Sequence, residues 1–451
     1  MNDTITAIST APGMGAISII RISGSESINI VSKIFKGKDL NVVDTHTINY
    51  GYIIDNQKVI DEVLVSVMKG PKTFTTEDIV EINCHGGIAT TNKILEIVLS
   101  NGARLAEPGE FTKRAYLNGR IDLTQAESVM DIINAKTEKA RTLAINQLTG
   151  KVTDKIRNIR EKLIQLIANI EVNIDYPEYE DIEIMTKEKI KKDVKCIEEE
   201  LQKILNSSEN GKIVKDGINV AIIGKPNVGK SSLLNLMLEE EKAIVTDIEG
   251  TTRDIVEGQI NLDGILLNII DTAGIRETED IVESLGVKKS LKMIEKADLI
   301  LFLLNNNEKI TTEELTLLSQ IQQKANIVII NKMDLPQKID MEELKSYNII
   351  KMSTIDGNGI ENLYTKIKDK YHFKEIEMSD MTYLSNARSI SLLKQAISSI
   401  KLVKENIEID LPIDLIEIDL KNSWEILGQI IGESYEEELI DNLFKRFCLG
   451  K

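Results

Sequence analysis

The chain has 451 residues, of which 42% are hydrophobic and 28% are charged, and this length predicts about three domains of ordinary size. Its formal net charge of −17 argues against a general nucleic-acid binder, and most of the negative charge lies after residue 215. No apolar run approaches the roughly 20 residues of a membrane helix, and the first residues lack the basic region of a signal peptide. Three widely spaced cysteines predict a reducing, cytoplasmic location.

Residues 1–118 combine short β-branched runs with Gly and Pro, which predicts an α+β domain. The runs are Ile17–Ile22, Val63–Val67 and Ile79–Ile82. Residues 119–214 have apolar positions at helical spacing and predict the first part of a helical domain. The clearest of these positions are Leu163, Leu166, Ile167 and Ile170. Residues 374–451 interleave acidic and apolar positions and predict its second part.

Residues 215–373 differ from both helical parts, because apolar runs alternate here with helical segments. The runs are Ile218–Ile223, Ile265–Ile270, Leu299–Leu304 and Ile327–Ile330. Such alternation predicts a mostly parallel sheet with helices on both faces. The predicted fold class is therefore multidomain, with an N-terminal α+β domain and an α/β domain inserted into a discontinuous all-helical domain.

A phosphate-binding pattern, GxxxxGK[ST], occurs at Gly224–Ser231 between a predicted strand and a predicted helix. In such a loop, backbone N–H groups surround the phosphates at a helix amino terminus. We expect Lys230 to reach the β- and γ-phosphates and Ser231 to bind Mg²⁺. The nucleotide contacts expected from this segment are Asn227, Val228, Gly229, Lys230, Ser231 and Ser232.

Two further motifs follow apolar strands in the order expected of a GTPase. In Asp271-Thr272-Ala273-Gly274, the carboxylate would hold the Mg²⁺ shell through water and Gly274 would donate its N–H to the γ-phosphate. In Asn331-Lys332-Met333-Asp334, the carboxylate would accept from N1–H and the 2-amino group of guanine, donors that adenine lacks. Ser353 and Thr354 are expected to supply the loop under the base.

The segment Gly250–Asp254 lies where a first switch belongs, and Thr252 is the expected Mg²⁺ ligand within it. Ile275 stands where many small GTPases have a water-orienting Gln, so another group must act or the intrinsic rate must be negligible. Acidic residues that follow, including Glu283, are candidates, and each also fits a solvated surface acid. Asn227 offers an oxygen to a monovalent cation that would replace an arginine finger.

These motifs together resemble the MnmE (TrmE) family of tRNA-modification GTPases. The resemblance extends to the N-terminal third and to the CxGK ending at Cys448–Lys451. Its N-terminal blocks include Arg21–Gly24, Phe74–Asp78, His85–Gly87, Pro108–Thr112 and Leu117–Leu123. The PGEFT block at Pro108–Thr112 and the CxGK ending are the most specific parts, because neither belongs to GTPases in general.

The resemblance implies a homodimer formed through a folate-binding N-terminal domain, and a G domain that dimerises when GTP is bound. It also implies that the chain works in a heterotetramer with the FAD-dependent protein MnmG. That complex would add a carboxymethylaminomethyl group to C5 of the wobble uridine of certain tRNAs, and 5-formyl- or 5,10-methylene-tetrahydrofolate would be the bound folate.

Residue roles follow from the same resemblance. The positions matching K⁺ ligands are Asn227, Thr246, Ile248 and Thr251, and those matching Mg²⁺ ligands are Ser231 and Thr252. The positions matching folate contacts are Arg21, Glu81, Arg120 and Lys451. Glu283 matches an acid that acts through water, and Cys448 is a candidate catalytic thiol. Two departures are Met14, in a turn that often has a basic residue, and Arg120, which replaces a usual Lys.

Two other functions fit parts of the sequence. An RNA- or ribosome-associated GTPase switch without chemistry on RNA would need the same G domain. It would not need the N-terminal folate-like blocks or the CxGK ending. A membrane-surface GTPase is disfavoured, because the sequence has no basic amphipathic helix or lipidation signal.

Overall fold

The computed structural model describes residues 3–175, 187–239, 243–244, 256–270, 293–378, 383–433, 440, 443–445, 447 and 450. The chain divides into two compact units. The first contains residues 1–130, 147–200 and 391–451, and the second contains residues 131–146 and 201–390. The finer division into four domains, with boundaries after residues 118, 214 and 373, stays a prediction.

The first unit begins with a seven-stranded sheet in the order β3-β4-β5-β6-β2-β1-β7, whose neighbours are antiparallel except β1 and β7. Its strands are β1 (Ile5–Ile8), β2 (Gly15–Ser23), β3 (Phe35–Gly37), β4 (Thr47–Asp55), β5 (Lys58–Met68), β6 (Ile79–Gly86) and β7 (Arg104–Leu105). The three β-branched runs predicted in this region all lie within strands.

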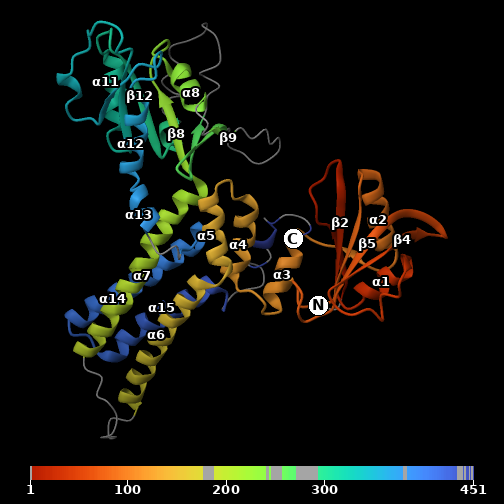
Figure 1. Cartoon of the computed structure of the whole chain (residues 1–451). Coiled ribbons are helices and arrows are strands. Elements are labelled where there is room, and N and C mark those ends of the chain that lie inside the picture. Colours follow the sequence, from red (N-terminus) through yellow and green to blue (C-terminus); the bar gives the residue numbers. More distant parts are fainter. Residues whose placement is uncertain are drawn as a thin grey trace. The chain divides into compact units, whose positions relative to one another are not determined.

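One face of this sheet is covered by helices α1 (Ser27–Ile34) and α2 (Ile88–Ser100), which share a hydrophobic core with it (Figure 1). Strand β5 shows that the other face is exposed, because Val63 and Val65 are buried in that core while Leu64 between them points to the opposite face and is exposed. The opposite face therefore keeps apolar side chains in contact with solvent.

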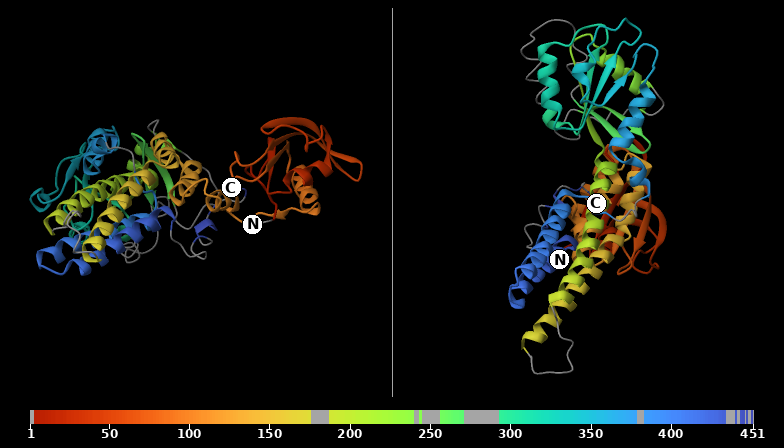
Figure 2. Two further views of the ribbon diagram at one scale, coloured as in Figure 1. Left: turned by 90° about the horizontal axis from the view of Figure 1, so that it is seen from below. Right: turned by 90° about the vertical axis from the view of Figure 1, so that its left-hand side faces the viewer.

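Helices α4 (Leu123–Asn134), α6 (Lys151–Asp175), α7 (Lys187–Asp216), α14 (Ala387–Glu408) and α15 (Ile413–Ile431) lie in the predicted helical segments, and α3 (Glu110–Leu117) lies in the predicted α+β domain. The helical spacing predicted in α6 is confirmed, because its apolar stripe, including Leu163 and Ile170, is buried. Helices α6 and α7 run side by side (Figure 2), and Lys162 Nζ lies 2.7 Å from a carboxylate oxygen of Glu200.

The second unit has a seven-stranded sheet in the order β14-β13-β12-β8-β11-β10-β9. Its strands are β8 (Ile218–Ile223), β9 (Ala243–Ile244), β10 (Val256–Leu262), β11 (Ile265–Ile270), β12 (Leu299–Asn305), β13 (Asn326–Asn331) and β14 (Ile349–Lys351). Strands β8, β11, β12, β13 and β14 are parallel, and β9 and β10 are antiparallel additions. The mostly parallel sheet and the four predicted strands are confirmed.

Separate hydrophobic cores lie on the two faces of this sheet, as expected when its strands are buried on both sides. In β12, Leu301 and Leu303 belong to one core, and Phe302 and Leu304 belong to the other. Among its described residues, the unit contains α5 (Glu138–Leu148), α8 (Lys230–Glu239), α11 (Thr312–Ile321), η1 (Glu342–Leu344, a 3₁₀ turn), α12 (Ile360–Lys370) and α13 (Phe373–Met378), together with the end of α7. The carboxyl ends of the parallel strands β8 and β13 lie at the same edge of the sheet, and the predicted nucleotide-binding motifs begin there.

Candidate functional site

The phosphate-loop segment connects β8 to α8, and two of its glycines are required by close approaches. Gly229 has φ of +103°, and a Cβ atom there would lie 2.2 Å from Nδ2 of Asn331. A Cβ atom at Gly224 would lie 2.6 Å from the carbonyl oxygen of Leu303 in β12. The loop is therefore pressed against the ends of two neighbouring strands.

Lys230, the first residue of α8, folds its ammonium group back onto this loop. Its Nζ donates to the carbonyl oxygens of Gly224 at 2.8 Å and Lys225 at 2.6 Å. Burial of the side chain lowers the pKa of Lys230 from its usual value. A cation held at the amino end of a helix, beside the helix's own unpaired N–H groups, is suited to binding a phosphate.

The other residues of this segment that are predicted to contact the nucleotide are neighbours of Lys230 in sequence. Asn227 is exposed and has φ of +59°, and Val228 is buried. Ser231 and Ser232 are exposed in the first turn of α8. The loop thus presents the polar residues predicted to contact the nucleotide and Mg²⁺, and packs Val228 inward.

Asn331, at the end of β13, joins two loops by hydrogen bonds. Its Nδ2 donates to the carbonyl oxygen of Val228 at 2.8 Å and to Oγ1 of Thr354 at 3.1 Å. Its Oδ1 accepts from the backbone N–H of Thr354 at 3.1 Å. Because Asn331 is completely buried, these contacts hold the phosphate loop and the 353–354 loop in a defined relation.

The side chain of Asp334 is exposed beside this junction, and Oγ of Ser353 donates to its Oδ1 at 3.0 Å. Ser353 is buried, so it orients the carboxylate that the sequence assigns to guanine. The hydroxyl of Thr354 adds a contact to Asn331. The 353–354 loop therefore lies against the predicted base-binding motif.

A further anchor of the phosphate loop lies outside the nucleotide-binding motifs. Lys225 Nζ lies 2.9 Å from a carboxylate oxygen of Glu314, which is buried at the start of α11. Glu314 also forms a capping box with Thr311, in which each side chain bonds the other's backbone N–H. The signal was present in the sequence as the Thr-x-x-Glu pattern that precedes an apolar run.

Several predicted site residues lie outside the described residues. They are Thr246, Ile248, Thr251, Thr252, Asp271, Thr272, Ala273, Gly274, Glu283, Cys448 and Lys451. Their roles stay predictions.

The first unit brings together two predicted folate contacts and the end of the chain. Arg21 in β2 and Glu81 in β6 are cross-strand partners, and Nε of Arg21 donates to Oε1 of Glu81 at 2.8 Å. A guanidinium nitrogen of Arg21 donates to the carbonyl oxygen of Gly450 at 3.3 Å, and Oγ of Ser9 donates to the same oxygen at 3.1 Å. Gly450 has φ of +86°, and a Cβ atom there would lie 2.4 Å from the Ile8 carbonyl oxygen.

Arg120, the third predicted folate contact within the described residues, lies in a different local setting. It is exposed, its guanidinium carbon lies 5.0 Å from the centre of the Phe74 ring, and a guanidinium nitrogen donates to the Phe74 carbonyl oxygen at 3.3 Å. Phe74 packs in the cluster that contains Phe111, and Arg21 lies 5.7 Å from the Phe111 ring centre. Each arginine therefore lies beside an aromatic ring, and both rings belong to or pack against the same hydrophobic cluster.

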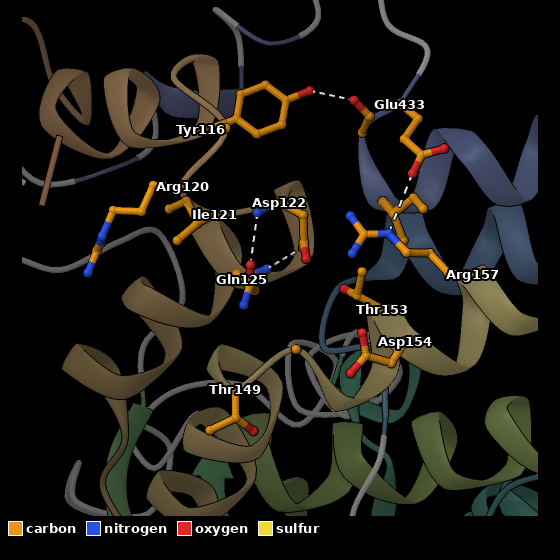
Figure 3. A pocket seen from close by; sticks show the side chains of 14 residues that line it. Tyr116, Arg120, Ile121, Asp122, Gln125, Thr149, Thr153, Asp154, Arg157 and Glu433 are labelled. Carbon is orange, nitrogen blue, oxygen red and sulfur yellow. Dashed lines mark hydrogen bonds and ion pairs between the residues drawn. The ribbon is translucent and has the colours of Figure 1, made fainter. Parts of the chain in front are cut away.

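Arg120 also lines a polar pocket of about 340 Å³, shown in Figure 3. Its wall includes Asp122, Asp154, Arg157 and Glu433. Tyr116 closes one side by donating its hydroxyl hydrogen to the Gly432 carbonyl oxygen at 2.7 Å, and Gln125 caps the start of α4 by accepting from the Asp122 N–H.

The Pro108–Thr112 block has a structural explanation in the same unit. Gly109 has φ of +71°, and a Cβ atom there would lie 2.6 Å from the Phe444 carbonyl oxygen. Glu110 follows as the first residue of α3 and binds Arg104 at 2.6 Å and Arg114 at 3.1 Å. The block therefore packs against the C-terminal segment that carries Gly450.

Two known protein families match this chain, and together the matches span nearly all of it. Residues 4–120 match the family described as GTP-binding protein TrmE N-terminus, and residues 123–448 match the MnmE helical domain. The chain is 52% identical over 450 residues to the tRNA modification GTPase MnmE of Streptococcus thermophilus, covering 100% of this chain and 98% of the relative. It is 54% identical over 455 residues to the MnmE of Bacillus cytotoxicus, covering 100% and 99%.

Among solved structures, the G domain of the Thermotoga maritima FeoB iron transporter is 27% identical and covers 34% of this chain and 98% of that chain, with a TM-score of 0.26. Throughout the part of the chain that the structure describes, every helix is too short or too polar to cross a bilayer.

Proposed function

The chain belongs to the MnmE family of tRNA modification GTPases, and we propose that it is a K⁺-stimulated, Mg²⁺-dependent GTPase acting with MnmG on the wobble uridine of certain tRNAs. In this proposal, the complex adds a carboxymethylaminomethyl group to C5 of the base in the cytoplasm. A reduced folate, 5-formyl- or 5,10-methylene-tetrahydrofolate, occupies the N-terminal domain and provides the one-carbon unit. The GTPase cycle drives the conformational changes of the complex.

The nucleotide part of the proposal is supported by the junction at Asn331, which ties the phosphate loop to the base-recognition loop. Lys230 would contact the β- and γ-phosphates, and Ser231 with Thr252 would hold Mg²⁺. Asn227 would bind K⁺, helped by the backbone of the first switch, and Glu283 would orient the attacking water. The described part of that set, from Asn227 to Ser232, lies in one loop and the first helical turn.

The observation that carries the folate part is the meeting of Arg21, Glu81 and Gly450 in the first unit. Arg21 and Gly450 are separated by most of the chain, and the contact brings Gly450 to Arg21, whose guanidinium also bonds Glu81. A carboxylate beside a guanidinium suits the polar edge of a pterin, which carries both hydrogen-bond donors and acceptors. A regulatory switch without one-carbon chemistry has no need of this arrangement.

The proposed homodimer is supported by the open face of the N-terminal sheet. Tyr50, Leu64 and Asn83 are cross-strand neighbours on that face, and Ile48 and Ile17 extend its apolar surface. Ile48 is 69% exposed and Ile17 is 61% exposed. A patch of this kind on one side of a sheet is typical of a protein interface.

The tRNA nucleosides of a strain lacking this gene test the proposal. Mass spectrometry should find carboxymethylaminomethyluridine in the parent strain, none in the deletion strain, and restoration by the wild-type gene. Arg21→Met, which removes the contacts to Glu81 and Gly450, should fail to restore it while the purified variant still hydrolyses GTP. Unchanged nucleoside levels in the deletion strain would refute the proposed chemistry and favour a GTPase switch.

A further inference from the structure

The carboxyl end of α7 makes an unusually close contact with β11, within the second unit. The helix ends at Asp216, and Gly217 follows with φ of +79° before β8 begins (Figure 1). A Cβ atom at Gly217 would lie 2.6 Å from the Leu266 carbonyl oxygen and 2.9 Å from Nδ2 of Asn268. Only glycine permits the helix end to approach the strand this closely.

Asn268 uses this approach to join three elements through one buried side chain. Its Nδ2 donates to the Asp216 carbonyl oxygen at 2.8 Å, which caps α7, and lies 3.4 Å from Oδ1 of Asn219 in β8. Its Oδ1 accepts from Nε2 of Gln259 in β10 at 2.9 Å. Asn268 is 6% exposed, so these hydrogen bonds form largely away from water.

The contacts continue from Asn268 and from the helix end to other segments of the unit. Gln259, which donates to Asn268, also accepts a hydrogen bond: Nζ of Lys136 donates to Oε1 of Gln259 at 3.0 Å. Nζ of Lys215 lies 2.7 Å from Oδ1 of Asp131 and donates to the Ser385 carbonyl oxygen at 3.2 Å. These contacts therefore connect the carboxyl end of α7 to residues 131–136 and to Ser385, which precedes α14.

The same strands lead to the nucleotide site. Strand β8 runs directly into the phosphate loop at Gly224, and β11 ends at Ile270, immediately before Asp271. Asn268 lies two residues before the end of β11 and is the cross-strand partner of Asn219. A shift of β11 relative to β8 would change the geometry of the hydrogen bonds that Asn268 makes, because such bonds weaken steeply when misaligned.

We propose that Asn268 is a positioning residue that transmits the nucleotide state of the phosphate site to the end of α7 and to residues 131–136. The polar network offers discrete hydrogen-bonded arrangements, which an apolar contact at this point would not. The inference rests on the GTPase identity of the chain and not on the proposed tRNA chemistry. It does not require Asn268 to contact the nucleotide.

Hydrogen–deuterium exchange of the full-length chain tests this role. Amide exchange in residues 131–146 and 205–216 is compared between the GDP-bound state and the state bound to a non-hydrolysable GTP analogue. In the wild type, the two states should differ in these segments. In Asn268→Leu, which keeps the side-chain size but removes both hydrogen-bonding groups, the difference should fall at least fivefold while nucleotide affinity stays within threefold.

Two further variants make the result decisive. Lys136→Met alters an exposed side chain and should reduce the difference in residues 131–136 even if Asn268→Leu does not fold. Asn348→Leu is the matched control, because it removes a 3.0 Å contact with Lys366 elsewhere in the same unit, and it should behave as wild type. The proposal is overturned if the wild type shows no nucleotide-dependent difference in these segments, or if Asn268→Leu and Lys136→Met retain the full difference. No tRNA is present, so failure of the proposed modification chemistry would not affect the outcome.

Discussion

Gly229 and Asn331 are separated by about a hundred residues in sequence, yet a Cβ atom on the first would lie 2.2 Å from the side-chain amide nitrogen of the second. The amide donates to the Val228 carbonyl oxygen, one residue before that glycine. The phosphate loop and the predicted guanine-recognition motif are therefore in direct contact, and a change in either should disturb both.

Gly229→Ala should weaken GTP binding and destabilise the second unit. The left-handed backbone costs a residue with a Cβ about 1–2 kcal/mol, and displacing Asn331 adds to it, so we expect GTP affinity to fall roughly tenfold or more. Isothermal titration calorimetry and chemical unfolding would measure the two effects. Gly357→Ala is the control, because Gly357 also has positive φ but has no neighbour closer than 3.8 Å, and its GTP affinity should stay near that of the wild type.

Asp334→Asn should change the base that the site prefers. In the proposed site the carboxylate would accept from two donors of guanine, and loss of these charged contacts should reduce GTP affinity about hundredfold. The Asn amide can donate to the 2-oxo group of xanthine, so affinity for xanthosine triphosphate should rise. Competition binding with both nucleotides would measure the switch.

Ser353→Ala removes the hydrogen bond that orients the Asp334 carboxylate but leaves the negative charge in place. The serine hydroxyl only positions Asp334, so the variant should lose GTP affinity by about tenfold or less and still prefer guanine. If Asp334→Asn retains wild-type affinity and preference for GTP, the assignment of Asp334 to the base is wrong.

Much of this arrangement could be predicted from local sequence. The buried strands of the second unit appear as continuous apolar runs because both sheet faces are covered, and the phosphate loop has a distinctive spacing. The contact of Gly450 with Arg21 could not be derived from propensity or spacing, because it depends on how the C-terminal segment packs against Gly109. The hydrogen bonds of Asn331 could not be predicted from sequence either, because the motif predicts a contact with the nucleotide and not hydrogen bonds that join two loops.

Asn227→Ala should remove the K⁺ dependence of GTP hydrolysis. Asn227 is exposed in the phosphate loop with a positive φ, where its side-chain oxygen is available to a cation. Positive charge near the β/γ bond stabilises the transition state, so wild-type turnover in KCl should exceed turnover in NaCl on the order of tenfold or more. The variant should hydrolyse GTP at the low rate in both salts, with GTP affinity little changed. Equal wild-type rates in K⁺ and Na⁺ would reject the assignment.

The stability of the first unit should fall at acidic pH through Glu110. Burial raises the pKa of this carboxyl, but the hydrogen bonds from Arg104, the Glu107 N–H and Arg114 outweigh it, and the net shift is downward from 4.5. The ionised form is therefore favoured by folding, so its contribution is fully present above the unfolded pKa and is lost as the pH falls through the lower, folded pKa. The pKa of Asp3 is also lowered, mainly by its hydrogen bond with Arg104. Protonation of Asp3 at acidic pH should therefore also reduce the stability of the folded state.

Chemical unfolding monitored between pH 7 and pH 3 would measure this dependence. Wild-type stability should be insensitive to Glu110 from pH 7 to about pH 5 and should decline below about pH 4.5. Glu110→Gln should be less stable at neutral pH and should show a shallower acid decline, with a residual slope from Asp3. Glu107→Gln, which changes an exposed side chain but keeps the backbone donor to Glu110, should follow the wild-type curve. An unchanged acid slope in Glu110→Gln would mean that other carboxyl groups control the unfolding.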